Sequence, residues 1–266
     1  MKQEKHIDGF ECFRETIHGL KVSFVNISTR VIADHLGQKV GQYATIYTGR
    51  FSELEDIKPA VECLAECLNR FLAPFRDKPL LIVGIGDASS AFDELGPKVI
   101  RCIPAYMFSS LHVSCAFESV ALLAPGTAAQ NNVSTAAVIS GMVQAVKPSC
   151  VLLIDVNCTS DLENFSSVIH LSTGGLSISG SGEDLTPDIL GVPVLVITAP
   201  LVFSISPETV KLMRLSTDEN GVNLAGTGIT QEMEITVSII SNGIIRTAYP
   251  DLDLEELNTA RLWSPF

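Results

Sequence analysis

Two aspartates follow apolar runs of the chain. Asp155 comes directly after Val-Leu-Leu-Ile, and Asp93 stands nine residues beyond the run Leu80–Gly84. Both runs predict buried parallel strands, whose carboxyl ends form the edge where open α/β sheets build their sites. Two carboxyls that meet there cannot both ionise easily. One would then hold a proton as an acid while the other, as a base, activates water against a carbonyl.

A structural role for both aspartates is the alternative. Asp93 could cap the next helix, and Asp155 could be held by hydrogen bonds at its strand end. A buried carboxylate is costly unless it is paired, hydrogen-bonded or functional. Sequence spacing does not show that the two meet, although neighbouring parallel strands would allow it.

Nucleotide and serine chemistry are weaker interpretations. Gly84 and Gly86 follow a strand as in a dinucleotide-binding loop, but Ser89 takes the third glycine position and Pro104 that of the acidic ribose ligand. The glycines are better explained by a sharp turn at the strand edge. No G-x-S-x-G elbow of a serine hydrolase is present.

Metal binding has little support. Cys63 and Cys67 lie four apart on a predicted helix, but they have no histidine or further cysteine nearby, so packing is favoured. The seven cysteines contain no C-x-x-C, which indicates a reducing compartment. His170 is the one histidine near a predicted strand end and a glycine-rich segment, and a structural role for it is favoured. We expect no metal and no cofactor.

Composition excludes several classes of protein. A net charge of −12 over 266 residues argues against direct nucleic-acid binding, which needs clustered Lys and Arg. Mean hydropathy is high at +0.32. The longest apolar runs, such as Val192–Val202, contain proline and fall short of the roughly 18 residues that a membrane helix needs. The first ten residues lack the apolar stretch of a secretory signal. These features predict a soluble cytoplasmic protein with no membrane partner.

Strands alternate with helices along the chain. We predict strands at 21–27, 42–48, 80–84, 119–123, 151–156, 168–171 and 193–197. We predict helices at 52–72, where Ser52 and Glu55 match a capping box, at 93–103, at 135–146 after Ser134 as N-cap, at 207–215 and at 230–249. Several strands are apolar throughout, which indicates a mostly parallel sheet covered on both faces. We expect one α/β domain over residues 1–266.

Three motifs together resemble the bacterial spore germination protease family. GIGDASSAFDELGPKV (84–99) resembles the loop that carries the family's first aspartate, and LLIDVN (152–157) resembles the strand that carries the second. GSGEDLTPDILGVPVLVITAP (180–200) resembles a GSG segment followed by an apolar strand. Each motif is weak alone, but the ordered set continues over about residues 19–253 and is quite specific.

The resemblance implies a phosphorylase/hydrolase-like three-layer α/β fold, shared with hydrogenase maturation peptidases. It also implies an endopeptidase that degrades small acid-soluble spore proteins at germination, in the cytoplasm of the spore core. Family members are homotetrameric zymogens, so residues 1–18 are expected to be propeptide-like or flexible. Asp93 and Asp155 match the family's atypical aspartic pair. The loops expected at the site are formed by Gly84, Gly86, Asp87, Gly180, Ser181 and Gly182.

Several positions depart from the family pattern. Phe92 replaces a proline, Asp87 replaces an asparagine, the arginine after the second aspartate is missing, and an acid is lost within 172–179. These changes leave two alternatives open. One is a catalytically inactive relative that binds spore proteins or the protease. The other is a metal-sensing maturation-type peptidase in which His170 joins the two acids.

Overall fold

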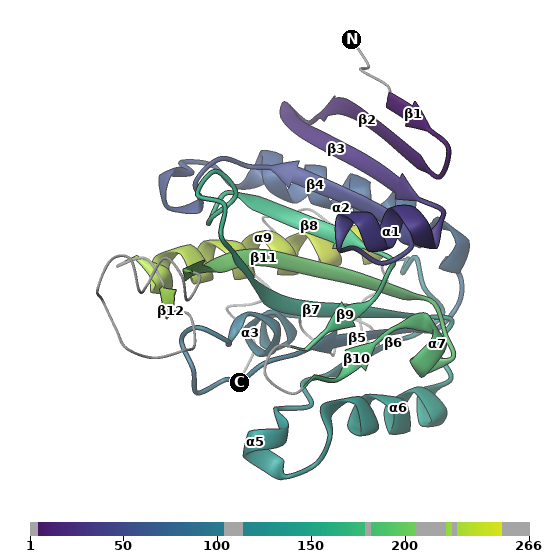
Figure 1. Cartoon of the computed structure of the whole chain (residues 1–266). Coiled ribbons are helices and arrows are strands. Elements are labelled where there is room, and N and C mark those ends of the chain that lie inside the picture. Colours follow the sequence, from purple (N-terminus) through teal and green to yellow (C-terminus); the bar gives the residue numbers. More distant parts are fainter. Residues whose placement is uncertain (1–4, 104–113, 179–181, 206–221, 225–227, 252–266) are drawn as a thin grey trace.

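A large mixed sheet forms the centre of the computed structural model, which describes residues 5–103, 114–178, 182–205, 222–224 and 228–251 (Figure 1). The sheet order is β1-β2-β3-β4-β8-β11-β7-β5-β6, and β12 pairs with β11. The strands are β1 (Lys5–Ile7), β2 (Phe10–Ile17), β3 (Leu20–Ile27), β4 (Gly41–Tyr47), β5 (Leu80–Gly84), β6 (Val120–Leu123), β7 (Cys150–Thr159), β8 (Val168–Ser172), β11 (Val194–Ile205) and β12 (Val222–Leu224). A separate small hairpin contains β9 (Leu176–Ser177) and β10 (Asp184–Leu185).

The parallel part of the sheet is its β11-β7-β5-β6 side. From β1 to β8 every neighbouring pair is antiparallel, and β8 also pairs antiparallel with β11. The predicted α/β fold is therefore confirmed, with the parallel arrangement confined to β11, β7, β5 and β6. Of these strands β7 carries Asp155, and Asp93 lies in the loop after β5. β5 and the first half of β7 are apolar on both sides, because helices cover both faces of the sheet at these strands.

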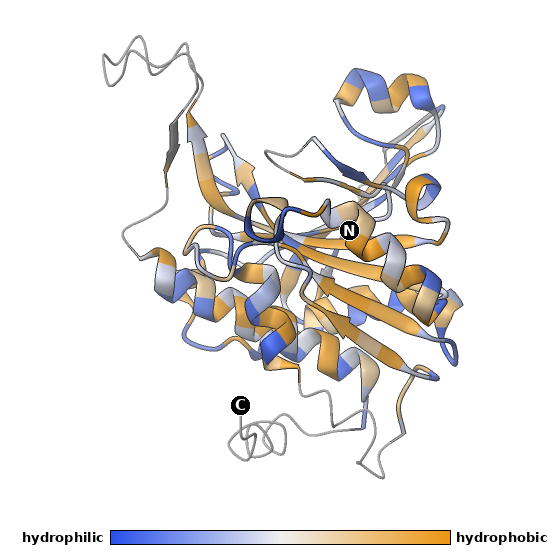
Figure 2. Ribbon diagram, turned by 90° about the horizontal axis from the view of Figure 1, so that it is seen from below, coloured by the Kyte–Doolittle hydropathy of each residue, from blue (hydrophilic) through white to orange (hydrophobic). Residues whose placement is uncertain are grey.

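Helices cover the two faces of the sheet. They are α1 (Arg30–Leu36), α2 (Lys58–Leu72), α3 (Leu95–Cys102), α5 (Ala128–Asn131), α6 (Thr135–Val146), α7 (Pro187–Leu190) and α9 (Ile229–Ala248), with short 3-10 turns at Phe51–Glu53 and Ala73–Phe75. One core joins one face to α2, α3 and α9, and a smaller core joins the other face to α6 and α7. Side chains alternate between them, so Ile82 and Leu152 face the first core while Val83 and Leu153 face the second. Hydrophobic residues concentrate on these central strands (Figure 2).

The predicted elements mostly appear where the sequence indicates them. The helix at 135–146 is α6, and the Ser134 side chain accepts its cap hydrogen bond from the Ala137 N–H at 3.1 Å. The predicted helix at 207–215 lies outside the described residues. Residues 5–17, within the stretch expected to be propeptide-like or flexible, form β1 and β2, and β2 pairs with β3 along its whole length.

The predicted start of the second helix is wrong. Residues 51–53 form only a 3-10 turn, and α2 begins at Lys58 with Pro59 in its first turn. Proline at the start of a helix has a suitable φ and lacks an N–H that would be unsatisfied there. The Ser52 hydroxyl donates instead to Glu232 at 3.3 Å. Cys63 and Cys67 of α2 are fully buried in the larger core, which confirms their packing role.

Candidate active site

Asp155 lies on β7, directly beyond the end of the neighbouring strand. Gly84, the last residue of β5, is opposite Ile154, so the Asp155 side chain projects past the β5 edge. It stands two residues after Leu153 and therefore points to the face that α6 covers. The residue is only 6% exposed, and its Oδ1 accepts a hydrogen bond from the Val156 N–H at 2.8 Å.

Asp93 is brought to this edge by a loop that needs glycine at defined points. Gly86 has a φ of +131°, and a Cβ there would lie 2.0 Å from the Asp93 carbonyl oxygen. Only glycine combines that backbone conformation with so close an approach. The Asp87 N–H donates to Asp93 Oδ2 at 3.0 Å, which fixes the carboxyl within the loop. The glycines thus shape the loop that presents Asp93.

The helix-cap explanation of Asp93 is wrong. Glu94, and not Asp93, is the N-cap residue of α3, and no side chain caps that helix. The Asp93 carboxyl turns back into the loop, toward Asp87. A structural role as a cap therefore does not account for a half-buried carboxyl at this position.

Burial and mutual repulsion both act on the two carboxyls. Burial raises the pKa of Asp155 well above its usual range, and the negative charge of Asp93 raises it further, against the smaller opposite effect of the Val156 hydrogen bond. Burial also raises the pKa of Asp93, the Asp87 charge adds to this, and the Asp87 N–H partly offsets it. The structure therefore brings together two carboxyls whose pKa values are both raised. Such a pair titrates as a unit and can share one proton.

Asp87 organises the same loop. Its Oδ1 accepts from the N–H and hydroxyl of Ser89, at 2.7 and 2.6 Å, and from the Gln130 amide of α5. These hydrogen bonds lower the pKa of this exposed carboxyl, so it stays ionised. Asp87 is thus an anchor between two loops beside the acids.

The remaining predicted site residues lie apart from the pair or outside the description. Gly180 and Ser181 are not among the described residues, and Gly182 has a φ of +68° with open space around it. His170 of β8 is opposite Thr198 of β11, and Thr198 is opposite Asp155, so a whole strand separates the histidine from the acid. Within the described ranges, no three His, Cys, Asp or Glu residues gather in a way that could hold a metal ion.

Sequence reasoning missed two polar residues beside Asp155. Asn157 follows it by two positions on β7, so the period of a strand places both on one face. Thr198 is a buried polar residue within the apolar run Val194–Phe203 of β11 and is directly opposite Asp155. A polar residue inside an apolar strand, or two residues after a candidate acid, is the signal that could have identified them.

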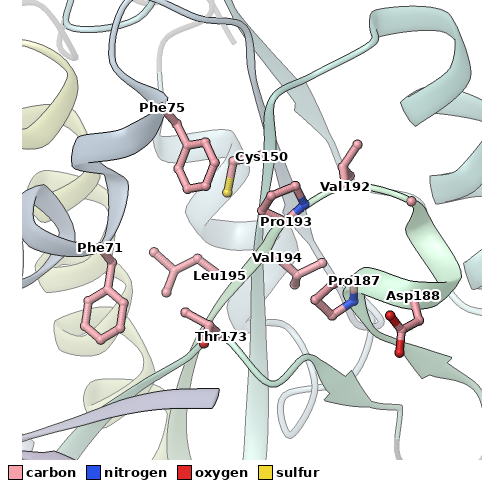
Figure 3. A pocket seen from close by; sticks show the side chains of 11 residues that line it. Phe71, Phe75, Cys150, Thr173, Pro187, Asp188, Val192, Pro193, Val194 and Leu195 are labelled. Atoms are coloured by element: carbon pink, nitrogen blue, oxygen red, sulfur yellow. The ribbon is translucent and has the colours of Figure 1, made fainter. Parts of the chain in front are cut away.

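A separate cavity of about 610 Å³ opens at the other end of these strands (Figure 3). Phe71 and Phe75 line one side, and Cys150 and Leu195 lie near the starts of β7 and β11. Asp188 of α7 is the carboxylate in its wall. The cavity is thus at the amino ends of the parallel strands, away from Asp93 and Asp155.

An α/β sheet with two carboxyls of raised pKa at the ends of adjacent parallel strands is suited to acid–base hydrolysis. Comparison with known families agrees with this class of chemistry: the profile of the germination protease family matches residues 1–216. The chain belongs to the germination protease family, which is a family of peptidases.

Germination proteases of several bacteria are similar to this chain. That of Caldanaerobacter subterraneus is 30% identical over 210 residues, covering 75% of this chain and 65% of the relative. Those of Priestia megaterium and Bacillus subtilis are also 30% identical, covering 72% and 74% of this chain and 56% and 57% of the relatives. The chain thus spans between about half and two thirds of the length of these relatives.

Among solved structures, the [NiFe] hydrogenase maturation protease HycI from Thermococcus kodakarensis KOD1 is similar. It is 14% identical, with a TM-score of 0.40, covering 67% of this chain and 99% of that one. In the described part of the chain no helix is both long and apolar enough to cross a membrane.

Proposed function

We propose that this protein is an endopeptidase that degrades small acid-soluble spore proteins during germination, in the cytoplasm of the spore core. The observation that supports it most is the pair of carboxyls, Asp93 and Asp155, at one sheet edge in a chain of the germination protease family. The same family membership supports a homo-oligomer with no cofactor. The unmatched length of the relatives makes the full activity a proposal for this chain.

The two acids would act as general acid and general base because they differ in burial. Asp155 is the more buried, so it holds the shared proton and donates it to the oxygen of the scissile carbonyl. Asp93 is only half-buried, so it is the member of the pair that carries the negative charge and takes a proton from the water that attacks the carbonyl carbon. When the tetrahedral intermediate collapses, the C–N bond breaks, the proton on Asp93 passes to the leaving nitrogen, and Asp155 takes back a proton from a hydroxyl as the carbonyl forms again. General acid–base groups of this kind contribute about 10²- to 10⁴-fold in rate.

The test is incubation of the purified protein with a small acid-soluble spore protein, beside Asp93→Asn and Asp155→Asn. We expect cleavage by the parent and a loss of roughly 10²-fold or more in each variant. Asp188→Asn, in the cavity at the opposite edge of the sheet, is the matched control and should cleave like the parent. Each reaction is repeated with a chelator, which should leave the rate unchanged.

Different outcomes contradict different parts of the proposal. No cleavage by the folded parent, also after removal of amino-terminal residues, would contradict the peptidase activity and favour a non-catalytic relative. Cleavage that survives both substitutions would contradict the residue assignment. Loss of cleavage with chelator would favour the metal-dependent alternative.

A further inference from the structure

A groove of about 630 Å³ runs across the sheet beside Asp155. Its floor is made by β7, β11, β8, β4 and β3, and its walls by the end of α1 and by β9. In Figure 1 this face is toward the viewer, with α1 and β9 in front of the strands. The volume lies within the range of roughly 300–1,000 Å³ that is usual for ligand sites.

A row of polar side chains crosses the floor of the groove from the candidate acid. Asp155 is opposite Thr198, Thr198 is opposite His170, and His170 is opposite Thr45. Residues directly opposite each other share a face, with Cβ atoms about 4.5–5.5 Å apart. The His170 Nδ1 and the Thr45 hydroxyl are hydrogen-bonded at 3.0 Å, which holds the imidazole in place. The row therefore connects Asp155 to the groove.

One buried polar atom along this floor lacks a protein partner within the described part of the chain. The Asn157 Oδ1 is buried without a hydrogen bond. The His170 ring is only partly buried, and its Nδ1 is hydrogen-bonded to Thr45. Buried polar atoms are nearly always hydrogen-bonded in native proteins, so an exception requires an explanation. Burial also lowers the pKa of His170, which keeps its ring neutral. Asn157 and His170 both line the groove.

The far end of the groove is apolar. Phe10, Val25 and Ile27 line it, together with Leu36 at the end of α1. Leu36 is 46% exposed, which leaves a large apolar side chain open toward the groove. This end would bury an aliphatic or aromatic side chain of a ligand.

We propose that this groove binds one side of the substrate polypeptide in an extended conformation, with its backbone along the polar row and an apolar side chain at the Leu36 end. The proposal rests on the proposed function, because it places the scissile bond at Asp155. The strands from β7 to β3 span about 19 Å at about 4.8 Å per step, which is the length of about six extended residues. Asn157 Oδ1 accepts a peptide N–H, and His170 positions the backbone through Nε2.

Binding is measured apart from cleavage, using a fluorescently labelled small acid-soluble spore protein and the inactive Asp93→Asn/Asp155→Asn double variant. In that background, His170→Leu and Asn157→Ala should each weaken binding about five- to tenfold, since each removes a hydrogen bond to the substrate. Leu36→Ser should weaken it about tenfold. Val31→Ser, on the same helix but outside the groove and 78% exposed, should bind like the parent.

Further experiments distinguish a role of His170 in positioning the substrate from a loss of folded structure in its variants. His170→Gln keeps an amide near Nε2 and should recover most of the binding, with a urea midpoint like that of the parent. In the active enzyme, His170→Leu and Leu36→Ser should raise KM with kcat little changed. Substrate peptides shortened by about six residues on one side of the cleaved bond should lose affinity, while equal shortening on the other side should not.

The outcomes distinguish the groove from the peptidase activity. Binding that depends on His170 and Leu36, without cleavage by the parent, supports the groove and contradicts the proposed function. Cleavage by the parent with unchanged affinity in all groove variants overturns the groove and leaves the function standing. No binding by the double variant overturns this assignment of the groove.

Discussion

The burial of Asp155 makes the stability of the folded protein depend on pH. Below the unfolded-state pKa of about 3.9 the carboxyl is protonated in both states. Above it the unfolded chain releases the proton while the folded protein retains it, because the folded-state pKa is raised. Stability therefore falls as pH rises through this window and levels off above the folded-state pKa.

Asp155→Asn should remove this loss of stability. We expect the variant to match the parent near pH 4 and to become increasingly more stable than the parent as the pH rises from there. Urea unfolding at a series of pH values measures the difference. Asp87→Asn is the control with the opposite sign, because hydrogen bonds lower the pKa of Asp87 and its contribution is lost as the pH falls. A parent that gains stability with pH relative to Asp155→Asn would contradict the argument.

At the scale of single residues, the sequence allowed part of the site to be predicted. Asp93 and Asp155 could be identified because each follows a buried apolar run, and the structure places those strands side by side. The row from Asp155 through Thr198 to His170 could not be found, because it depends on which strands are neighbours and in what register. Neither is encoded in local spacing.

At the scale of elements, the contact of α3 with β5 positions Asp93. A Cβ on Gly96 of α3 would lie 2.3 Å from the Ile85 carbonyl oxygen, so the helix and the strand end touch through their backbones. Gly96→Ala should destabilise the protein by about 1–3 kcal/mol, as overpacking does. It should also lower cleavage, because α3 begins two residues after Asp93. Urea unfolding and the cleavage assay measure both effects.

Gly141 of α6 is the matched control for that change. It is also a helical glycine, but a Cβ there would meet nothing within 4 Å. Gly141→Ala should stabilise the protein by about 0.5–1 kcal/mol through the better helix propensity of alanine. Equal effects of the two substitutions would show that backbone contact does not determine the position of α3.

The starts of two helices show what can and cannot be predicted from the local sequence. The sequence predicts Ser134 as an N-cap, and the structure confirms it, because the Ser134 hydroxyl accepts a hydrogen bond from the Ala137 N–H. Ser52 satisfied a capping pattern equally well, yet its hydroxyl binds Glu232, which is 180 residues away in sequence. A tertiary contact with a buried carboxylate overrides a local pattern, and no local window contains that information.

At the scale of the whole molecule, the sheet has a parallel half that carries the acids and an antiparallel half that forms most of the groove floor. The α/β class could be predicted from the apolar strands and intervening helices. The antiparallel half could not, because the pairing of β4 with β8 joins segments more than 120 residues apart. The groove exists only where these two halves meet.

The first strands complete this antiparallel half, which predicts the effect of removing them. Ile17 of β2 is 4% exposed within the larger core, and Phe13 stacks on Phe24 of β3 with ring centroids 5.0 Å apart. Burial of one such aliphatic side chain contributes about 1.5–3 kcal/mol. A chain that lacks residues 1–18 should therefore have a lower urea midpoint and expose the β3 edge to association, which size-exclusion chromatography would detect.

Removal of residues 1–4 alone leaves β2 in place and is the matched control. This shorter deletion should keep both the urea midpoint and the binding of spore protein, whereas the longer one should also weaken binding because Phe10 lines the groove. The two deletions should differ because only the longer one removes β2 from the sheet. If the chain without residues 1–18 were as stable as the parent and cleaved faster, then β2 would act as a removable cover, and the groove would need only β3 at its far end.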